Sequence, residues 1–244
     1  MKKTHAAITA EGSALKKYQE VMVGSRSVFT LLYYELCMLL APLPGALGMV
    51  LRKVFWPRMF GSCGKGCMFA AGIVVRHPGR IHLGRSVVIS EGCILDGRHG
   101  TAEQSIQLGD NVILSNNVML SCKNGTISIG NDTGINAQAI IQSTNDCPVS
   151  IGRDCIIGQR CLVIGGGSYH MDRLDIPIRK QGIRDDGGIV LADNVWLGGN
   201  VTVLGGVTME SGSVAAAGAV LTKSVPADSV SMGVPARTVR NRSA

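Results

Sequence analysis

Aromatic side chains are scarce in this sequence: four Phe, four Tyr and two Trp make up 4% of its 244 residues. An ordinary compact core relies on large rings to fill its volume, so this composition argues against one. The basic residues form no stripe with interleaved aromatic residues, which argues against nucleic acid as a partner. Glycine, in contrast, is abundant, with 32 residues, and 45% of the chain is hydrophobic. This combination favours a fold that stacks many small, similar layers.

An apolar leader is also lacking, because the basic start at Lys2 and Lys3 continues into a polar stretch. We therefore expect a cytoplasmic protein. The formal net charge of +7 fits an ordinary solvated surface. Part of it forms a cluster of Arg237, Arg240 and Arg242, which a phosphorylated cofactor could use.

The eight cysteines lack the arrangement of a zinc site. Cys63 and Cys67 are separated by three residues, and no second Cys/His pair follows at the spacing that zinc requires. Cys93, Cys155 and Cys161 fall on the small inward position of the repeat described next. The sequence therefore predicts packing cysteines and no metal.

A six-residue repeat is the strongest pattern in the chain. From residue 191 to 221 an apolar residue recurs at every sixth position, and a small residue follows four positions after each. The apolar positions are Leu191, Leu197, Val203, Met209, Ala215 and Leu221, and the small ones are Val195, Val201, Val207, Ser213, Ala219 and Val225. The same phase recurs upstream from Phe69 to Val163. Three such hexads make one turn of a triangular prism, in which inward residues stack coil upon coil. The sequence thus predicts an all-β fold, a left-handed parallel β-helix of hexapeptide repeats.

The repeat is interrupted at three places. Extra residues occur at 98–103 and around Asn145 and Asp146, and the largest excursion, glycine-bounded and polar, covers 164–190. Loops that leave a regular solenoid are the usual places for function. The predicted organisation is a polar tail (1–27), a helical N-terminal segment (28–62), the β-helix (63–227) with its excursion loop (164–190), and a basic C-terminal segment (228–244).

The helical segment is predicted to contain two short helices joined at Pro42 and Pro44. Residues 36–51 carry no charge, but Glu35 and the two prolines leave this run too short and broken for a transmembrane helix, which needs about 20 apolar residues. Two roles remain open for residues 28–60. They could cap the first coil, or they could form a peripheral membrane contact with basic residues facing anionic lipid.

Three motifs accompany the hexads: the loop ending in Tyr169-His170, the run Asp193–Gly198, and the closing Gly233–Arg237. Together they resemble the hexapeptide-repeat O-acetyltransferases, which include the maltose, galactoside and streptogramin acetyltransferases. This resemblance covers residues 105–240. Residues 28–104 more loosely resemble the membrane-adjacent acyltransferases of capsule and O-antigen clusters.

The resemblance implies a reaction and its catalytic groups. Acetyl-CoA would donate an acetyl group to a hydroxyl of a sugar or saccharide-like acceptor, in a homotrimer with sites between adjacent prisms. His170 matches the loop histidine that acts as general base, and Asn136 and, more loosely, Asp146 match residues that hold the acceptor. The chemistry agrees for His170, since a hydroxyl is a weak nucleophile at neutral pH and needs an adjacent base.

The resemblance also implies residues for the donor. Trp196 matches a residue that walls the pantetheine channel, Gly199 and Ala217 match positions whose backbone accepts pantetheine, and Lys223, Arg237 and Arg240 match positions that bind the CoA phosphates. Plainer interpretations exist. Asn136 could turn a corner of the prism, Asp146 could start the turn at Cys147 and Pro148, and Trp196 could be buried under the His170 loop.

Other functions remain open as alternatives. A zinc enzyme of the γ-carbonic-anhydrase kind needs three converging histidines, whereas His77, His82 and His99 lie in early coils, far from His170. A non-catalytic scaffold is the second alternative. Among acyltransferases, an acyl-carrier protein could replace acetyl-CoA as donor, and a non-sugar metabolite could replace the saccharide.

Overall fold

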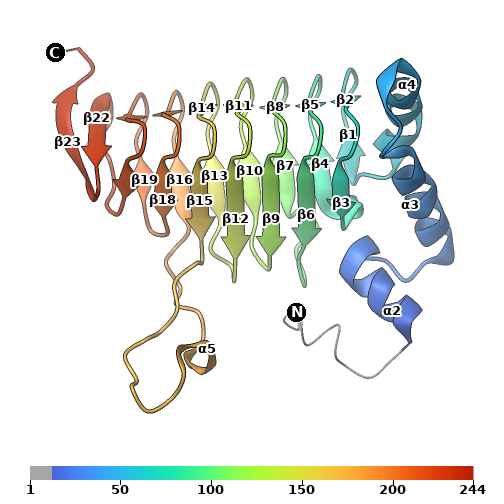
Figure 1. Cartoon of the computed structure of the whole chain (residues 1–244), viewed down its shortest axis with the longest axis horizontal. Coiled ribbons are helices and arrows are strands. Elements are labelled where there is room, and N and C mark those ends of the chain that lie inside the picture. Colours follow the sequence, from blue (N-terminus) through green and yellow to red (C-terminus); the bar gives the residue numbers. More distant parts are fainter. Residues whose placement is uncertain (1–12, 244) are drawn as a thin grey trace.

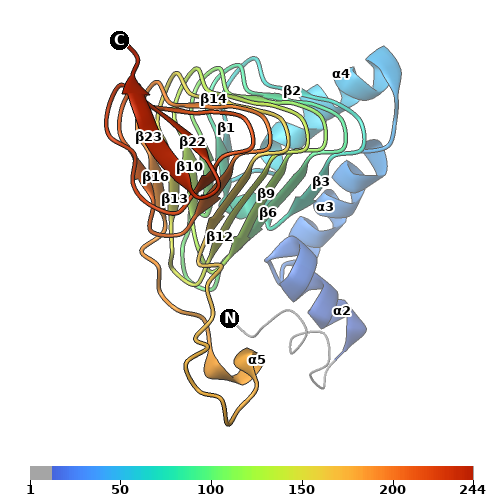
Figure 2. The same cartoon turned by 60° about the vertical axis from the view of Figure 1, so that its left-hand side comes forward.

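The computed structural model describes residues 13–243, and most of them belong to a triangular prism whose three faces are mainly parallel sheets (Figures 1 and 2). Each coil contributes one strand to each sheet, in the order A, B, C. Sheet A contains β1 (Ser62–Cys63), β4 (Ile81–Leu83), β7 (Ile106–Leu108), β10 (Ile127–Ile129), β13 (Val149–Ile151), β16 (Ile189–Leu191) and β19 (Thr208–Met209). Sheet B contains β2 (Met68–Phe69), β5 (Val88–Ile89), β8 (Ile113–Leu114), β11 (Gly134–Ile135), β14 (Ile156–Ile157), β17 (Trp196–Leu197), β20 (Val214–Ala215), β22 (Ser229–Gly233) and β23 (Ala236–Asn241). Sheet C contains β3 (Val74–Arg76), β6 (Ile94–Arg98), β9 (Met119–Lys123), β12 (Ile140–Thr144), β15 (Leu162–Gly165), β18 (Thr202–Leu204) and β21 (Val220–Leu221).

Equivalent hexad positions lie directly on one another in successive coils. In sheet B the inward row is Phe69, Ile89, Leu114, Ile135, Ile157, Leu197 and Ala215, and all seven are buried. Each side chain therefore packs on its copies in the neighbouring coils, and burial accumulates layer by layer, with one ring, Phe69, at the N-terminal end of the row. The predicted β-helix of hexapeptide repeats is confirmed.

The corners of the prism require a left-handed backbone. Asn111, Asp132 and Asn194 have φ values of 57°, 58° and 58° at the turn from sheet A to sheet B. Asn and Asp adopt this conformation more readily than other non-glycine residues, which explains their recurrence there. Cys93, Cys155 and Cys161 are free and buried at the small positions, as predicted.

Helices cover the N-terminal end of the prism (Figure 1). Within the segment predicted as a polar tail, residues 1–12 lie outside the described part, and helix α2 (Ala14–Tyr18) and a π-helical turn (Gln19–Val23) follow. Helices α3 (Val28–Leu40) and α4 (Gly45–Phe55) precede a 3-10 turn, Trp56–Arg58. Tyr34 Oη donates to the carbonyl oxygen of Val75 at 2.8 Å, and Arg52 Nε donates to that of Phe69 at 3.0 Å. These contacts bind α3 and α4 to the first coil, so the two helices do cap it.

Helices of the described part fall short of the length and apolar character that crossing a membrane demands. At the opposite end of the prism β23 pairs with β22 in an antiparallel hairpin. Between β15 and β16 the chain leaves the prism at the C–A edge, where sheet C passes into sheet A. This excursion contains helix α5 (Ile178–Gln181) and projects from the prism in both views (Figures 1 and 2).

Candidate active site

A groove of about 790 Å³ follows the C-terminal coils of sheet B and the B–C edge, where sheet B passes into sheet C. Five of the predicted site residues line it: Asn136, Trp196, Gly199, Ala217 and Arg240. Residues of the same coils complete the lining: Ile156, Gly158, Gln159, Asn194, Leu197, Gly198, Val214, Ala216, Val230 and Arg242.

Small residues on adjacent coils form the floor of the groove. A Cβ atom at Gly158 would lie 2.6 Å from the carbonyl carbon of Gly198, and one at Gly198 would lie 2.6 Å from the backbone nitrogen of Ala217. The coils therefore approach too closely for side chains at either glycine. Gly158, Gly198 and Ala217 all line the groove, so its floor at the B–C edge lies close to the backbone.

Trp196 forms a wall of the groove. It belongs to the outward row of sheet B, between Ile156 and Val214, and its side chain is 53% exposed. An exposed indole ring on a strand offers a flat apolar surface and an N–H donor. Within the single chain the ring is not buried under the His170 loop, so the plainer interpretation of Trp196 does not hold.

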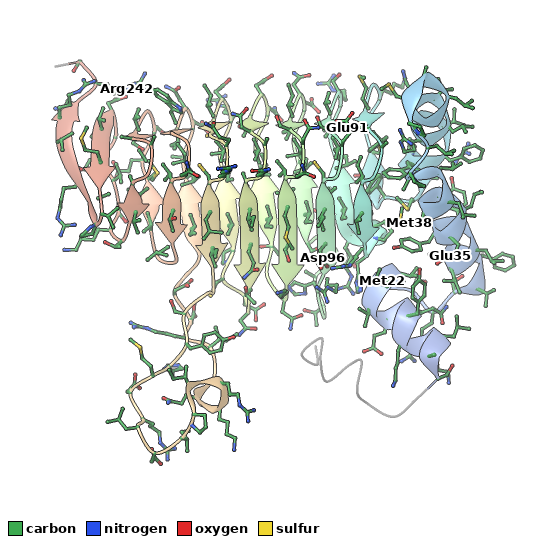
Figure 3. All side chains as sticks on the ribbon, in the orientation of Figure 1. Met22, Glu35, Met38, Glu91, Asp96 and Arg242 are labelled. Atoms are coloured by element: carbon green, nitrogen blue, oxygen red, sulfur yellow. The ribbon has the colours of Figure 1, made fainter. Side chains whose placement is uncertain are left out.

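The C-terminal hairpin supplies positive charge at one end of the groove. Arg240 and Arg242 both line the groove. Arg242 Nη1 donates to the carbonyl oxygen of Gly212 at 2.7 Å, which holds its guanidinium in place (Figure 3). Lys223 and Arg237 line a separate hollow of about 180 Å³. The structure thus divides the three predicted phosphate-binding residues between two depressions.

Asn136 begins the turn from sheet B to sheet C. Its Nδ2 atom donates to the carbonyl oxygen of Ile157, 3.1 Å away in the next coil. The left-handed corner residue is Gln138, with φ 63°, and not Asn136. The side chain is exposed, and its Oδ1 atom can still accept a hydrogen bond from a ligand.

His170 lies on the excursion loop and does not line the groove. Its backbone nitrogen donates to the carbonyl oxygen of Gly182 at 3.1 Å, and the backbone nitrogen of Arg184 donates to the carbonyl oxygen of Ser168 at 2.8 Å. The two arms of the loop therefore pair beside His170. The imidazole itself is exposed. His170 is therefore carried on a folded hairpin rather than on an irregular loop.

Asp186 clamps the neck of this loop. Its Oδ1 atom accepts from the backbone nitrogens of Gly166 and Gly188, at 3.0 Å each, on the outgoing and returning arms. A carboxylate that joins both arms fixes the direction in which the hairpin leaves the prism. Asp186 is a positioning residue that the sequence did not indicate.

Asp146 also lies at the C–A edge, one coil before the His170 loop, and not in the groove with Asn136. Asn145 and Asp146 both have left-handed φ values, 51° and 58°, in the turn between β12 and β13. The Oδ1 atom of Asp146 lies 3.8 Å from Nε2 of His99, and its side chain is largely exposed. Burial lowers the pKa of His99, an effect that the charge of Asp146 opposes.

Sequence reasoning missed several groove residues, among them Ile156, Gln159 and Val214. The repeat could have indicated them, because Ile156 and Val214 pair with Trp196 in the adjacent coils and Gln159 lies beside Gly199. Among residues 13–243, no group of three or more Cys, His, Asp or Glu side chains is placed to hold a metal ion. His77 and His82 instead contact the Glu20 carbonyl oxygen and Ser62 Oγ, both at 2.9 Å.

Known proteins agree with this architecture. The profile "Hexapeptide repeat of succinyl-transferase" matches residues 98–122, 148–167 and 189–223. A putative lipopolysaccharide biosynthesis O-acetyl transferase of Escherichia coli, WbbJ, is 30% identical over 142 residues, which are 56% of this chain and 71% of the relative. The chain belongs to the hexapeptide-repeat acetyltransferase family. The predicted class, an acyltransferase of this family, is thereby confirmed.

Two further proteins are similar to this chain, one in sequence and one in structure. The galactoside O-acetyltransferase of Escherichia coli is 31% identical over 97 residues, 39% of this chain and 45% of the relative. A crystallised mutant of AntD, an N-acyltransferase from Bacillus cereus in complex with dTDP-4-amino-4,6-dideoxyglucose and coenzyme A, is 20% identical, with a TM-score of 0.51 over 79% of this chain and 87% of that one. At this identity, AntD supports the fold alone.

Proposed function

We propose that this chain transfers an acetyl group from acetyl-CoA to a hydroxyl of a saccharide acceptor, at sites between the subunits of a homotrimer. His170 is the general base in this proposal. The groove carries it, because Trp196, Gly199, Ala217 and Arg240 line one continuous hollow of the kind that an extended, phosphorylated donor needs. Acetyl-CoA as donor implies a reaction in the cytoplasm.

The groove suits the donor along its whole length. A pantetheine arm can lie over the small residues Gly198 and Ala217, which line the groove. The Trp196 ring covers one side of it. Arg240 and Arg242 can pair with phosphate groups, for which bidentate guanidinium contacts are well suited.

The chemistry requires one base and one leaving group. His170 accepts the proton of the acceptor hydroxyl while the oxygen of that hydroxyl attacks the thioester carbonyl carbon. The tetrahedral intermediate collapses, the C–S bond breaks, and the imidazolium returns its proton to the departing CoA thiolate. General-base catalysis of this kind contributes on the order of 10²–10⁴ in rate.

A trimer is proposed because the required groups lie on different edges of one chain. His170 and Asp146 leave the prism at the C–A edge, whereas the donor groove lies on sheet B and the B–C edge. The excursion loop also carries exposed apolar side chains, Met171, Leu174 and Ile178. Such side chains are suited to packing on a neighbouring prism. The loop of one subunit then brings its base to the groove of the next.

The saccharide acceptor is supported by the relatives whose names state a function. One is associated with lipopolysaccharide biosynthesis and another with galactosides, and both are O-acetyltransferases. Asp146 and Asn136 are proposed to accept hydrogen bonds from hydroxyl groups of the acceptor. A non-sugar acceptor or a carrier-protein donor would use the same base and the same groove.

The test is acceptor-dependent release of free thiol. Purified protein is mixed with acetyl-CoA and a panel of sugars, nucleotide sugars and amino alcohols, beside the His170→Ala and Lys180→Ala variants. Lys180 lies on α5 of the same loop and serves as the control for general disturbance of the loop. Turnover that His170→Ala loses and Lys180→Ala keeps supports the proposal. Absence of CoA binding by the wild-type protein would refute it and favour the scaffold.

A further inference from the structure

Helices α3 and α4 each carry two apolar faces, and only one of them caps the β-helix. On α3 the side chains packed toward the first coil are those of Leu31, Tyr34 and Cys37. The opposite side of the helix exposes Phe29, Leu32, Leu36 and Leu39, at spacings of three and four residues. A cap needs the first face only.

Helix α4 repeats this arrangement. Gly48 and Arg52 are buried toward the prism. Leu47, Val50 and Val54 are exposed on the other side, again at spacings of three and four. Phe29 and Leu39, at 87% and 72% exposure, are among the least covered large apolar side chains of the described residues. A solvated helix normally presents polar residues on this side, so the outer face is built for an apolar partner.

The surroundings of this face are basic. Residues 26–65 contain a single acid, Glu35, and five Lys or Arg residues, of which only Arg52 is buried against the first coil. Glu35 accepts a hydrogen bond from Tyr18 Oη at 2.6 Å on the side of α2 (Figure 3). Lys53 and Arg58 are exposed beside the apolar stripes. A second copy packed symmetrically on this face would bring these cations together, whereas an anionic surface would attract them.

A cavity of about 580 Å³ opens between α3 and the first coils, next to the exposed Phe29 ring. Arg58 and Arg80 line it, together with one acid, Glu103. The buried Nη1 atom of Arg80 has no hydrogen-bond partner in the part of the chain that the structure describes. A guanidinium nitrogen left without a partner beside an apolar wall suits a phosphate attached to an apolar chain.

We propose that α3 and α4 form an interfacial foot that docks the protein on a bilayer containing anionic phospholipid. The outer stripes of both helices enter the boundary between headgroups and acyl chains, and Arg58 and Arg80 meet a lipid phosphate. Helices of 13 and 11 residues are only about 20 and 16 Å long, too short to span a hydrocarbon core of about 30 Å, so they lie in the plane of the surface.

The experiment is co-sedimentation of the full chain with vesicles of phosphatidylcholine alone or with phosphatidylglycerol added. We expect the wild-type protein to bind the anionic vesicles at least about tenfold more tightly than the neutral ones. Leu39→Glu is expected to weaken binding by about tenfold or more. Leu15→Glu places the same charge on a 56% exposed leucine of α2, outside both stripes, and is expected to change binding less than about twofold.

Three results would overturn the proposal. The first is no binding of the wild-type chain to anionic vesicles, and the second is an equal loss of vesicle binding in the Leu39→Glu and Leu15→Glu variants. The third is a wild-type assembly in solution whose mass falls by half in the Leu39→Glu variant. The last result would assign the face to a second copy. Thermal unfolding checks that both variants fold. His170→Ala should bind vesicles as the wild type does, and Leu39→Glu should still acetylate soluble acceptors, so this test is independent of the proposed reaction.

Discussion

The Nε2 atom of His99 lies 3.8 Å from the Oδ1 atom of Asp146, at the edge of the prism where sheet C passes into sheet A. The same edge sends out the His170 loop one coil later. Asn136 and Trp196 instead line the groove on sheet B and the B–C edge. His170 and Asp146 therefore lie at a different edge of the chain from Asn136 and the donor-side residues, and the proposed reaction combines the edges of two chains.

Subunit complementation follows from this separation. His170→Ala is expected to be nearly inactive alone, and Trp196→Ala to keep about a tenth of the wild-type activity at acetyl-CoA concentrations below KM, because each variant alters one half of every site. Mixed trimers formed by co-expression should recover about one quarter of the wild-type activity, since about one in four interfaces then joins a native His170 to a native Trp196. Thiol release by the mixture measures the recovery. If each site were built within one chain, the mixture would recover no activity.

Variants at the two edges should affect different quantities: CoA affinity for those in the groove, and the KM for the acceptor for those at the C–A edge. Trp196→Ala removes the groove wall and should weaken CoA binding about tenfold, as measured by titration calorimetry. Ile113→Ala alters the same outward row of sheet B outside the groove and should leave CoA binding unchanged. Asp146→Asn should raise the KM for the acceptor and leave CoA affinity intact. The assignment of Asp146 fails if CoA binding weakens instead.

Charge at the hairpin end of the groove predicts a salt-dependent contribution to donor binding. Arg240→Gln should lower the affinity for CoA about tenfold at low ionic strength, because a charge-assisted contact to phosphate is lost. The difference from the wild type should shrink as salt screens the interaction. Lys223→Gln, in the separate hollow, should have the smaller effect. Equal effects would place the phosphates between the two depressions.

The fold was predictable because its information is local. A period of six fixes which side chains point inward, so the stacked rows, the packing cysteines and the exit of the long loop follow from spacing alone. The same phase placed Trp196 on the outside of the prism, whereas Gly199 and Ala217 came from the resemblance to the acetyltransferases. The position of Asp146 beside His99 was not predictable, because two consecutive left-handed residues set its direction. The hairpin that brings Arg242 to Gly212 depends on long-range pairing that no hexad encodes.

Acid should weaken the attachment of the N-terminal helices through His77. His77 is 5% exposed, its Nε2 atom lies 2.9 Å from the carbonyl oxygen of Glu20, and its Nδ1 atom has no partner within residues 13–243. Burial lowers the pKa of His77 below its usual value, because protonation would place an unpaired N–H in the interior. The unfolded chain then binds more protons below its own pKa of about 6.5.

The free energy of unfolding should therefore be greatest above about pH 6.5 and should fall as the pH drops through that value toward the lower folded pKa. Urea unfolding between pH 5 and 8 measures the slope. His77→Gln should flatten it, and His99→Gln should flatten it further, since burial also lowers the pKa of His99. A slope that both variants retain would show that other groups set the acid response.

Arg52 is expected to control the stability of the cap. Its side chain is 1% exposed, and Nη1 donates to the carbonyl oxygens of Leu40 and Leu43, at 2.9 and 2.7 Å, where α3 ends. The Leu40 carbonyl also accepts from the backbone nitrogen of Leu43 at 3.4 Å, and the guanidinium adds a shorter hydrogen bond there and complements the negative end of the helix dipole. Arg52→Met keeps most of the volume and removes every donor. It should lower the free energy of unfolding by about 3 kcal/mol, because buried carbonyl oxygens lose their hydrogen bonds.

The control is Lys53→Met, on the exposed side of the same helix, which should change the free energy of unfolding by less than about 0.5 kcal/mol. If the two variants unfold alike, the carbonyl contacts of Arg52 do not hold α3 and α4 on the first coil, and the hydrogen bond of Tyr34 to Val75 and the packing of Leu31 and Cys37 do so instead.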